Sequence, residues 1–124
     1  MAREIIIQAG SVTVEAELYD NATADAIWNG LPIEARGNRW GEEIYFSIPV
    51  KAPVVDPHPV VELGELAFWP PGNAFCIFFG PTPASMGDEC RAASAVSRFG
   101  RIKGDALQLT AVRSGEKVTV KKKE

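Results

Sequence analysis

Residues 12–19 read VTVEAELY, and apolar and polar side chains alternate through the whole stretch. Successive side chains of a β-strand point to opposite faces, so this alternation predicts a strand with one apolar face. The apolar residues that share this face are Val12, Val14, Ala16 and Leu18. Such a strand is typical of an antiparallel sheet that has one face on the core and one in water.

Working outward, the chain is predicted as a series of short β-strands. The β-rich residues 4–8 and the turn residues 9–11 make a hairpin with the strand at 12–19. Six more strands are predicted, at residues 43–48, 60–63, 65–69, 75–79, 95–103 and 117–121. Residues 85–94 have the composition of a loop, and three prolines exclude a regular ladder at 53–59. The predicted helices are short, at residues 24–29 and 105–112.

Eight short strands and two short helices in 124 residues predict one mainly β domain over residues 1–124. Small all-β domains remove exposed edges by closing the sheet, so a barrel with two peripheral helices is favoured. A β-sandwich is the alternative. In either fold, the core is predicted to contain Val12, Val14, Leu18, Ile44, Phe46, Phe75, Ile77 and Val118.

The charge pattern excludes several classes of partner. The formal net charge is −3, and the basic run of Lys121, Lys122 and Lys123 is read as a solvated terminus, so we expect no nucleic-acid binding. No apolar stretch approaches the roughly 20 residues that cross a bilayer, so we expect no membrane association and a cytoplasmic location. The oligomeric state stays open.

The residue types that usually bind metals or act as nucleophiles are scarce. His58 is the only histidine and is read as an exposed loop imidazole, so no metal site and no cofactor are predicted. Cys76 and Cys90 are expected to be free thiols, Cys76 buried and Cys90 reactive in its loop.

The acidic residues do not predict a mechanism. Glu42 and Glu43 are adjacent on a strand, so their side chains point to opposite faces and do not share a proton. We expect the Glu42 side chain to lie in solvent and the Glu43 side chain to be able to reach a buried contact. Both Glu62 and Glu65 are expected to lie on the surface.

Four aromatic residues beside the turns are the candidate ligand-binding residues: Trp40, Tyr45, Phe68 and Trp69. Large rings next to loops form the walls of an apolar pocket in many ligand sites. The alternative is that these rings only plug the ends of the barrel.

Several segments resemble the cyclophilins. GELAFW at 64–69, FCIFFGPTP at 75–83 and SRFGRIKG at 97–104 are similar to cyclophilin motifs. More closely, NRWGEEIYF at 38–46, WPPG at 69–72 and ASAV at 93–96 are similar to a group of small bacterial and archaeal proteins with a cyclophilin-like fold. The resemblance implies a closed eight-stranded barrel with helices at its ends.

The resemblance also implies prolyl isomerase chemistry, but the matched groove positions differ. Positions that carry a glutamine, a phenylalanine, a histidine and a small residue in cyclophilins fall on Ala74, Cys76, Val96 and Trp69. Arg39 is the candidate for the catalytic arginine, on an exposed turn where its loss would leave stability almost unchanged.

Three functional hypotheses follow. The first is a binding module for a proline-containing peptide or a small apolar ligand, with weak or no isomerase activity. The second is a divergent peptidyl-prolyl isomerase that uses Arg39. The third is a domain whose groove is filled by its own aromatic rings and which acts as a subunit of a larger assembly.

Overall fold

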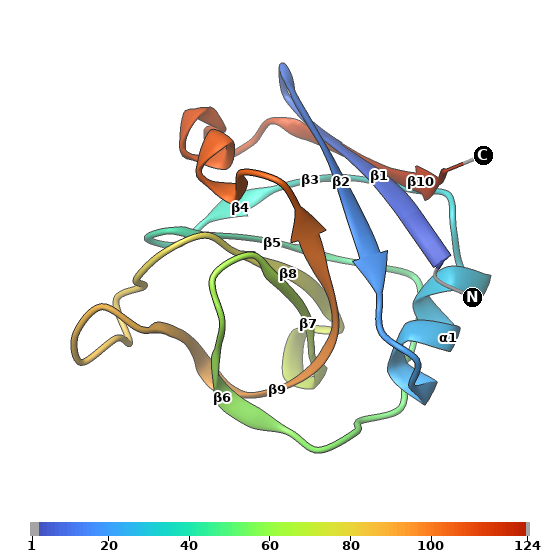
Figure 1. Ribbon diagram of the computed structural model, residues 1–124, viewed down its shortest axis with the longest axis horizontal. Helices are drawn as coiled ribbons and strands as arrows, with labels where there is room; N and C mark the ends of the chain where they lie inside the picture. The colour runs from blue at the N-terminus through green and yellow to red at the C-terminus, as the bar shows by residue number, and fades with distance from the viewer. Residues whose placement is uncertain (1–2, 124) are drawn as a thin grey trace.

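The computed structural model describes residues 3–123 and is mainly β (Figure 1). Its first five strands are β1 (Arg3–Ala9), β2 (Val12–Leu18), β3 (Ile33–Arg36), β4 (Asn38–Arg39) and β5 (Glu43–Ser47). The other five are β6 (His58–Val61), β7 (Glu65–Trp69), β8 (Ala74–Phe78), β9 (Cys90–Lys103) and β10 (Lys117–Lys122). One α-helix, α1 (Ala22–Asn29), and two 3₁₀ segments, η1 (Pro70–Gly72) and η2 (Ala106–Ala111), complete the described residues.

The strands form one ten-stranded antiparallel sheet in the order β3-β10-β1-β2-β9-β7-β8-β5-β4, with β6 paired to β9. Figure 1 shows the strands curving around a common interior, with α1 and η2 on opposite sides. The two end strands, β3 and β4, follow each other in the chain across Gly37, but within residues 3–123 no strand pairing joins them. The prediction of eight strands was too low because β3 and β4 are too short to show a period.

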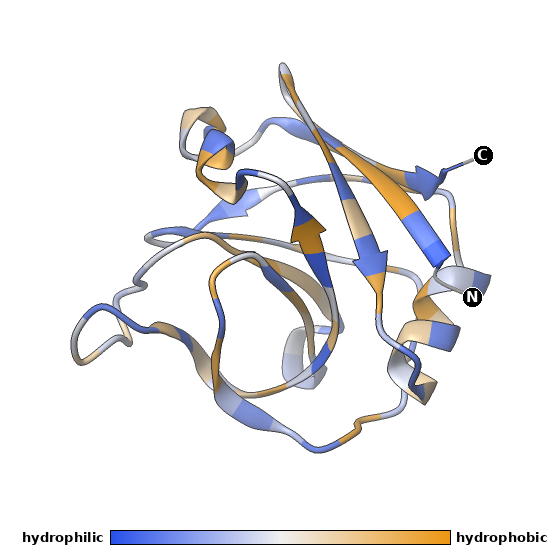
Figure 2. Cartoon of the chain, viewed as in Figure 1, coloured by the Kyte–Doolittle hydropathy of each residue, from blue (hydrophilic) through white to orange (hydrophobic). Residues whose placement is uncertain are grey.

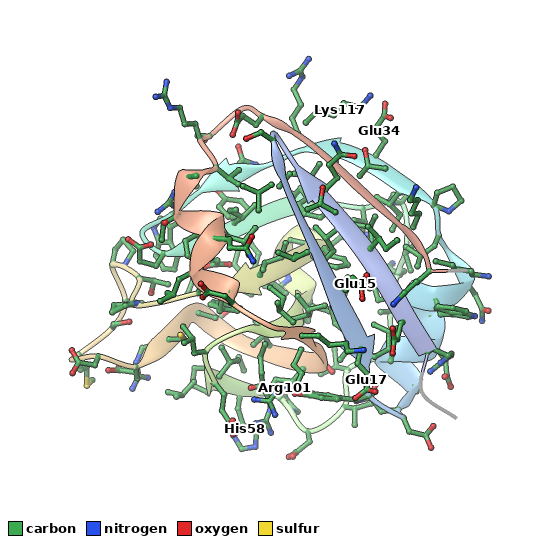
Figure 3. All side chains as sticks on the ribbon, turned by 45° about the horizontal axis from the view of Figure 1, so that its top comes forward. Glu15, Glu17, Glu34, His58, Arg101 and Lys117 are labelled. Carbon is green, nitrogen blue, oxygen red and sulfur yellow. The ribbon has the colours of Figure 1, made fainter. Side chains whose placement is uncertain are left out.

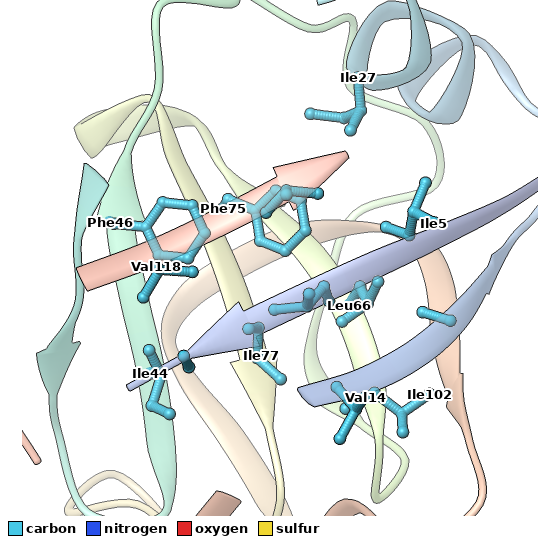
Figure 4. Close-up of a cluster of buried hydrophobic side chains, with 14 of the residues drawn as sticks. Ile5, Val14, Ile27, Ile44, Phe46, Leu66, Phe75, Ile77, Ile102 and Val118 are labelled. Atoms are coloured by element: carbon cyan, nitrogen blue, oxygen red, sulfur yellow. The ribbon is translucent and has the colours of Figure 1, made fainter. Parts of the chain in front are cut away.

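A large apolar core fills the interior of the curved sheet (Figure 4). Seven of the eight predicted core residues are buried, and Val12 packs at the edge. Figure 2 shows hydrophilic and hydrophobic residues following each other along β2, as the sequence predicts. At the centre, the Phe75 ring stacks on Phe46 and meets Phe99 edge-on, each with centroids 5.0 Å apart. The register of the central strands is therefore confirmed.

The two predicted helical segments lie where the sequence places them. Asn21 caps α1, because its side-chain oxygen accepts a hydrogen bond from the backbone N–H of Ala24 at 2.8 Å. Asp105 caps the second segment in the same way, but this segment is a 3₁₀ helix rather than an α-helix. No helix in the described part of the chain is long and apolar enough to cross a bilayer.

Strand β9 departs most from the prediction. Residues 90–94, predicted as loop, continue the predicted strand toward the N-terminus, so that β9 is 14 residues long. Its first half pairs with β6 and its second half with β2 and β7. The first half covers a second apolar cluster on the outer face of β7 and β8: Val61, Ala67, Ala74, Cys76, Phe78, Cys90, Ala92 and Val96. The domain thus has a covered outer face as well as a core.

The extension of β9 corrects the prediction for Cys90. This residue is 4% exposed in the strand rather than reactive in a loop. Cys76 is buried as predicted, and both are free thiols. Burial raises the pKa of each thiol, which disfavours the reactive thiolate.

Candidate functional site

A pocket of about 260 Å³ opens beside the outer cluster. Its walls come from five segments: the turn before β5, and strands β5, β7, β8 and β9. The lining residues are Trp40, Glu43, Tyr45, Trp69, Cys76, Ala92 and Ala93. Three aromatic rings and one carboxyl group therefore face the same space.

The hairpin between β4 and β5 brings Trp40 and Glu43 together. The backbone N–H of Trp40 donates to the carbonyl of Glu43 at 2.9 Å, which closes a two-residue turn. Gly41 takes φ +61°, a value that such turns require and that glycine adopts without strain. A β-carbon at Gly41 would also lie 2.8–2.9 Å from atoms of Pro83 and Thr82. After the turn, the alternation of β5 points Tyr45 to the same face as Glu43.

The indole of Trp69 is held in place by two further segments. Its ring lies over Gly72, where a β-carbon would come within 2.7 Å of it. Its Nε1–H donates to the hydroxyl of Ser94 at 2.7 Å. Gly72 belongs to the WPPG motif and Ser94 to the ASAV motif, so both motifs fix one pocket wall.

The chain's own relatives can now be identified. The sequence pattern of the Cyclophilin-like family matches residues 3–121. The chain belongs to the Cyclophilin-like family. The solution structure of the hypothetical protein AF2241 from Archaeoglobus fulgidus is similar, with a TM-score of 0.83 and 41% sequence identity over 98% of this chain and 95% of that one. A comparison with curated proteins gives no match.

Glu43 is the unusual group of this cyclophilin-like pocket. The residue is 4% exposed, and the Cys76 thiol, which lines the same pocket, also affects its ionisation. Burial raises the pKa of Glu43 from the usual 4.5 to about 7, and the thiol acts more weakly in the opposite direction. A carboxyl group with such a pKa changes between its protonated and ionised forms near neutral pH.

Glu65 provides the contrast, because this buried carboxyl group is fully paired. It is 3% exposed, so its predicted surface position was wrong. It accepts hydrogen bonds from the Tyr19 hydroxyl at 2.6 Å and the Glu62 backbone N–H at 2.7 Å, and Arg98 lies 3.9 Å away. Burial of a carboxylate is normally compensated in this way. Within residues 3–123, Glu43 has no such cationic or N–H partner.

Arg39 precedes the pocket but is not one of its lining residues. Its Nε donates to the carbonyl of Gly41 at 2.6 Å, and its Nη1 donates to the carbonyls of Val112 at 2.7 Å and Thr110 at 3.1 Å. Its Nη2 pairs with Glu42 at 3.0 Å, and the guanidinium lies over the ring of Phe79. Arg39 is therefore a structural anchor between the β4–β5 hairpin and η2, and the expectation of an exposed turn residue was wrong.

The other predicted residues are placed as follows. Trp40, Tyr45 and Trp69 are half-buried and line the pocket, whereas Phe68 is 1% exposed in the interior core. His58 is exposed at the start of β6, with Asp56 at 3.3 Å (Figure 3). Within residues 3–123 no group of three His, Cys, Asp or Glu side chains is arranged to hold a metal ion.

The sequence did not single out Ala92 and Ala93 as pocket residues, nor Glu43 as part of a site, whereas the cyclophilin resemblance matched Cys76 to a groove position. For Glu43 a signal was present, because the WGEE turn predicts a hairpin that sets Trp40 opposite it. The two alanines carry no such signal, since their place depends on the long-range course of β9.

We expect the raised pKa of Glu43 to make the protein less stable as pH rises. Between about pH 4.5 and 7 the folded state holds the Glu43 proton that the unfolded chain has released, so the free energy of unfolding falls over this window. Between pH 4.5 and 7.5, the free energy of unfolding of Glu43→Gln should therefore rise by about 2–3 kcal/mol relative to that of the wild type. Urea denaturation at several pH values measures the difference.

The matched control for this prediction is Glu34→Gln, because the Glu34 side chain is 65% exposed and pairs only with Lys117 on the surface (Figure 3). Its pH profile should run parallel to that of the wild type. If the profile of Glu43→Gln is equally parallel, Glu43 ionises in the folded protein as it does in the unfolded chain.

Proposed function

We propose that this cyclophilin-like domain binds a small ligand in the pocket between Trp40, Tyr45 and Trp69. One observation carries the proposal: NRWGEEIYF, WPPG and ASAV, three segments far apart in the sequence, all contribute to this pocket or fix its walls. Ligand sites are typically apolar and aromatic cavities with a few polar groups that orient the ligand. Here the polar groups are the Glu43 carboxyl, the Tyr45 phenol and the Cys76 thiol.

The size of the pocket favours a small molecule over a peptide. Its volume of about 260 Å³ lies just below the range of about 300–1,000 Å³ that is usual for drug-sized ligands. Next to the pocket, the outer face of β7 and β8 is covered by the first half of β9. A proline-containing peptide is therefore the second ligand to test. It would place a single side chain in the pocket.

A pair of alanine-to-tryptophan variants tests the pocket. Ala93 lines it and is exposed, so an indole at Ala93→Trp should obstruct it. Ala95, two residues further along β9, is equally exposed and lies outside the lining. Small-molecule fragments and a proline-containing peptide are screened by NMR chemical-shift changes at the Trp40 and Trp69 indole N–H groups.

We expect the bound fragments to lose at least about tenfold in affinity with Ala93→Trp and to keep their affinity with Ala95→Trp, a difference of about 1.4 kcal/mol or more. Fragments that shift resonances elsewhere, or that bind both variants equally, would place the binding site outside this pocket. Peptide binding without fragment binding would favour the peptide instead.

We further propose weak or no prolyl isomerase activity. At the matched groove positions, Ala74 and Cys76 on β8 and Val96 on β9 are buried in the outer cluster. The Arg39 guanidinium is engaged by three backbone carbonyls and Glu42. Lowering an isomerisation barrier of about 18–20 kcal/mol requires a donor that is free to bind the twisted amide. Wild-type protein should leave the isomerisation rate of proline-containing peptides near its uncatalysed value, and robust turnover would establish the enzyme.

A further inference from the structure

We infer that the ligand of this pocket is a small organic cation, whose ammonium group pairs with the Glu43 carboxylate among the rings of Trp40, Tyr45 and Trp69. This inference rests on the proposed function, because it names the ligand class for the same pocket. It begins from Glu43, the carboxyl group that lines the pocket without a cationic partner.

The first step of the argument is the charge of the pocket. The groups that face Glu43 are Trp40 from the turn, Tyr45 from β5, Trp69 from β7, Cys76 from β8, and Ala92 and Ala93 from β9. The titratable groups among them are a phenol and a thiol, and neither supplies a positive charge. An ionised carboxylate in such surroundings is costly, and a cation in the pocket removes this cost.

The neighbouring arginines do not supply the missing charge. Arg39 is held by Glu42 and the carbonyls of Gly41, Thr110 and Val112. Arg91, which precedes the lining residue Ala92, donates to Glu89 at 3.0 Å. Both arginines are therefore engaged away from the pocket, and the counter-charge must come with the ligand.

The second step is the aromatic wall. Two tryptophans and one tyrosine come from separate segments, and the faces of such rings attract cations, tryptophan most strongly. The Trp69 indole is fixed by Ser94 and Gly72, and the backbone of Trp40 is fixed by its hairpin, which reduces the ordering that binding requires. The ionised Glu43 carboxylate repels an anion, and a neutral apolar ligand makes no charge pair with it.

The test compares cations with neutral molecules of the same shape. The two pairs are choline with 3,3-dimethylbutan-1-ol, and benzylammonium with benzyl alcohol. Each is titrated by calorimetry at pH 8 against wild type, Glu43→Gln and the surface control Glu34→Gln. Circular dichroism checks that each variant is folded.

We expect at least one cation to bind wild type and Glu34→Gln about tenfold or more tighter than its neutral partner, a preference that Glu43→Gln lowers to the smaller contribution of the aromatic rings. The affinity of the cation should also fall as pH is lowered from 8 to 6, because protonation of Glu43 removes the counter-charge.

Four outcomes would overturn the inference. Neutral partners that bind as tightly as the cations would identify an apolar site, and a cation preference that is undiminished in Glu43→Gln would place the charge recognition elsewhere. If neither cation binds while neutral fragments from the previous screen still do, the assignment of the ligand as a cation is wrong, but the proposal that the pocket binds a small ligand is retained. If no molecule occupies the pocket, the proposed function fails as well.

Discussion

Replacing Phe75 with alanine is expected to lower the free energy of unfolding by about 3–5 kcal/mol. The ring is completely buried at the centre of the curved sheet, between Phe46 on β5 and Phe99 on β9. Its removal loses the free energy that is gained when a large apolar side chain leaves water. It also leaves a cavity that does not collapse, because strands lie on both sides of it. Two aromatic contacts add about 0.5–1.5 kcal/mol each beyond simple burial.

Urea denaturation followed by far-UV circular dichroism measures this loss. The matched control is Leu63→Ala, because Leu63 is a large apolar residue that is 52% exposed before β7. Its substitution should shift the free energy of unfolding by no more than about 0.5 kcal/mol. A Phe75→Ala variant as stable as Leu63→Ala would contradict the packing of the core shown in Figure 4.

The strands that follow most directly from the sequence are those with one face on the core. In β2 and β5 the alternation of apolar and polar residues follows from the pleat, and burial on one face sets their register. The same reason explains the correct prediction of the buried Phe46. Strand β8, which holds Phe75 and Ile77, is buried on both faces and was predicted from its almost wholly apolar sequence.

The first half of β9 could not be predicted in this way. Residues 90–96 read CRAASAV, with small and polar side chains and no regular period. Their strand conformation depends on pairing with β6 and on covering the outer face of β8, both of which are long-range contacts. A loop composition is therefore compatible with a strand when the covered surface requires small residues.

The candidate site could be predicted in part. Position in the turns suggested Trp40, Tyr45, Phe68 and Trp69 as ligand-binding residues. Trp40, Tyr45 and Trp69 line the pocket, and the alternation of β7 explains why Phe68 differs from Trp69. Leu66 and Phe68 point to the interior, so Ala67 and Trp69 must point outward. The sequence allowed a buried contact for Glu43, but not its place in the pocket, because the other lining residues beyond its own hairpin come from β7, β8 and β9.

Substitution of Arg39 by alanine is expected to destabilise the protein by about 3–4 kcal/mol, since hydrogen bonds that involve a charged group contribute about 1.5–3 kcal/mol each and are not additive. The side chain is 24% exposed and joins the β4–β5 hairpin to the end of η2 through the carbonyls of Thr110 and Val112, and it also donates to the carbonyl of Gly41 within the hairpin. Its loss leaves these carbonyls and the Glu42 carboxylate without their donor. Chemical denaturation measures the effect.

Two further variants separate the causes of this loss and bear on the isomerase hypothesis. Arg36→Ala is the matched control, because Arg36 is exposed and makes one side-chain hydrogen bond, to the carbonyl of Gly115. It should cost about 1 kcal/mol or less. Arg39→Lys keeps the positive charge near Glu42 but lacks the planar guanidinium group. It should therefore recover less than half of the free energy of unfolding that Arg39→Ala loses. A near-neutral Arg39→Ala would contradict the anchoring role and would leave the guanidinium available for a prolyl amide.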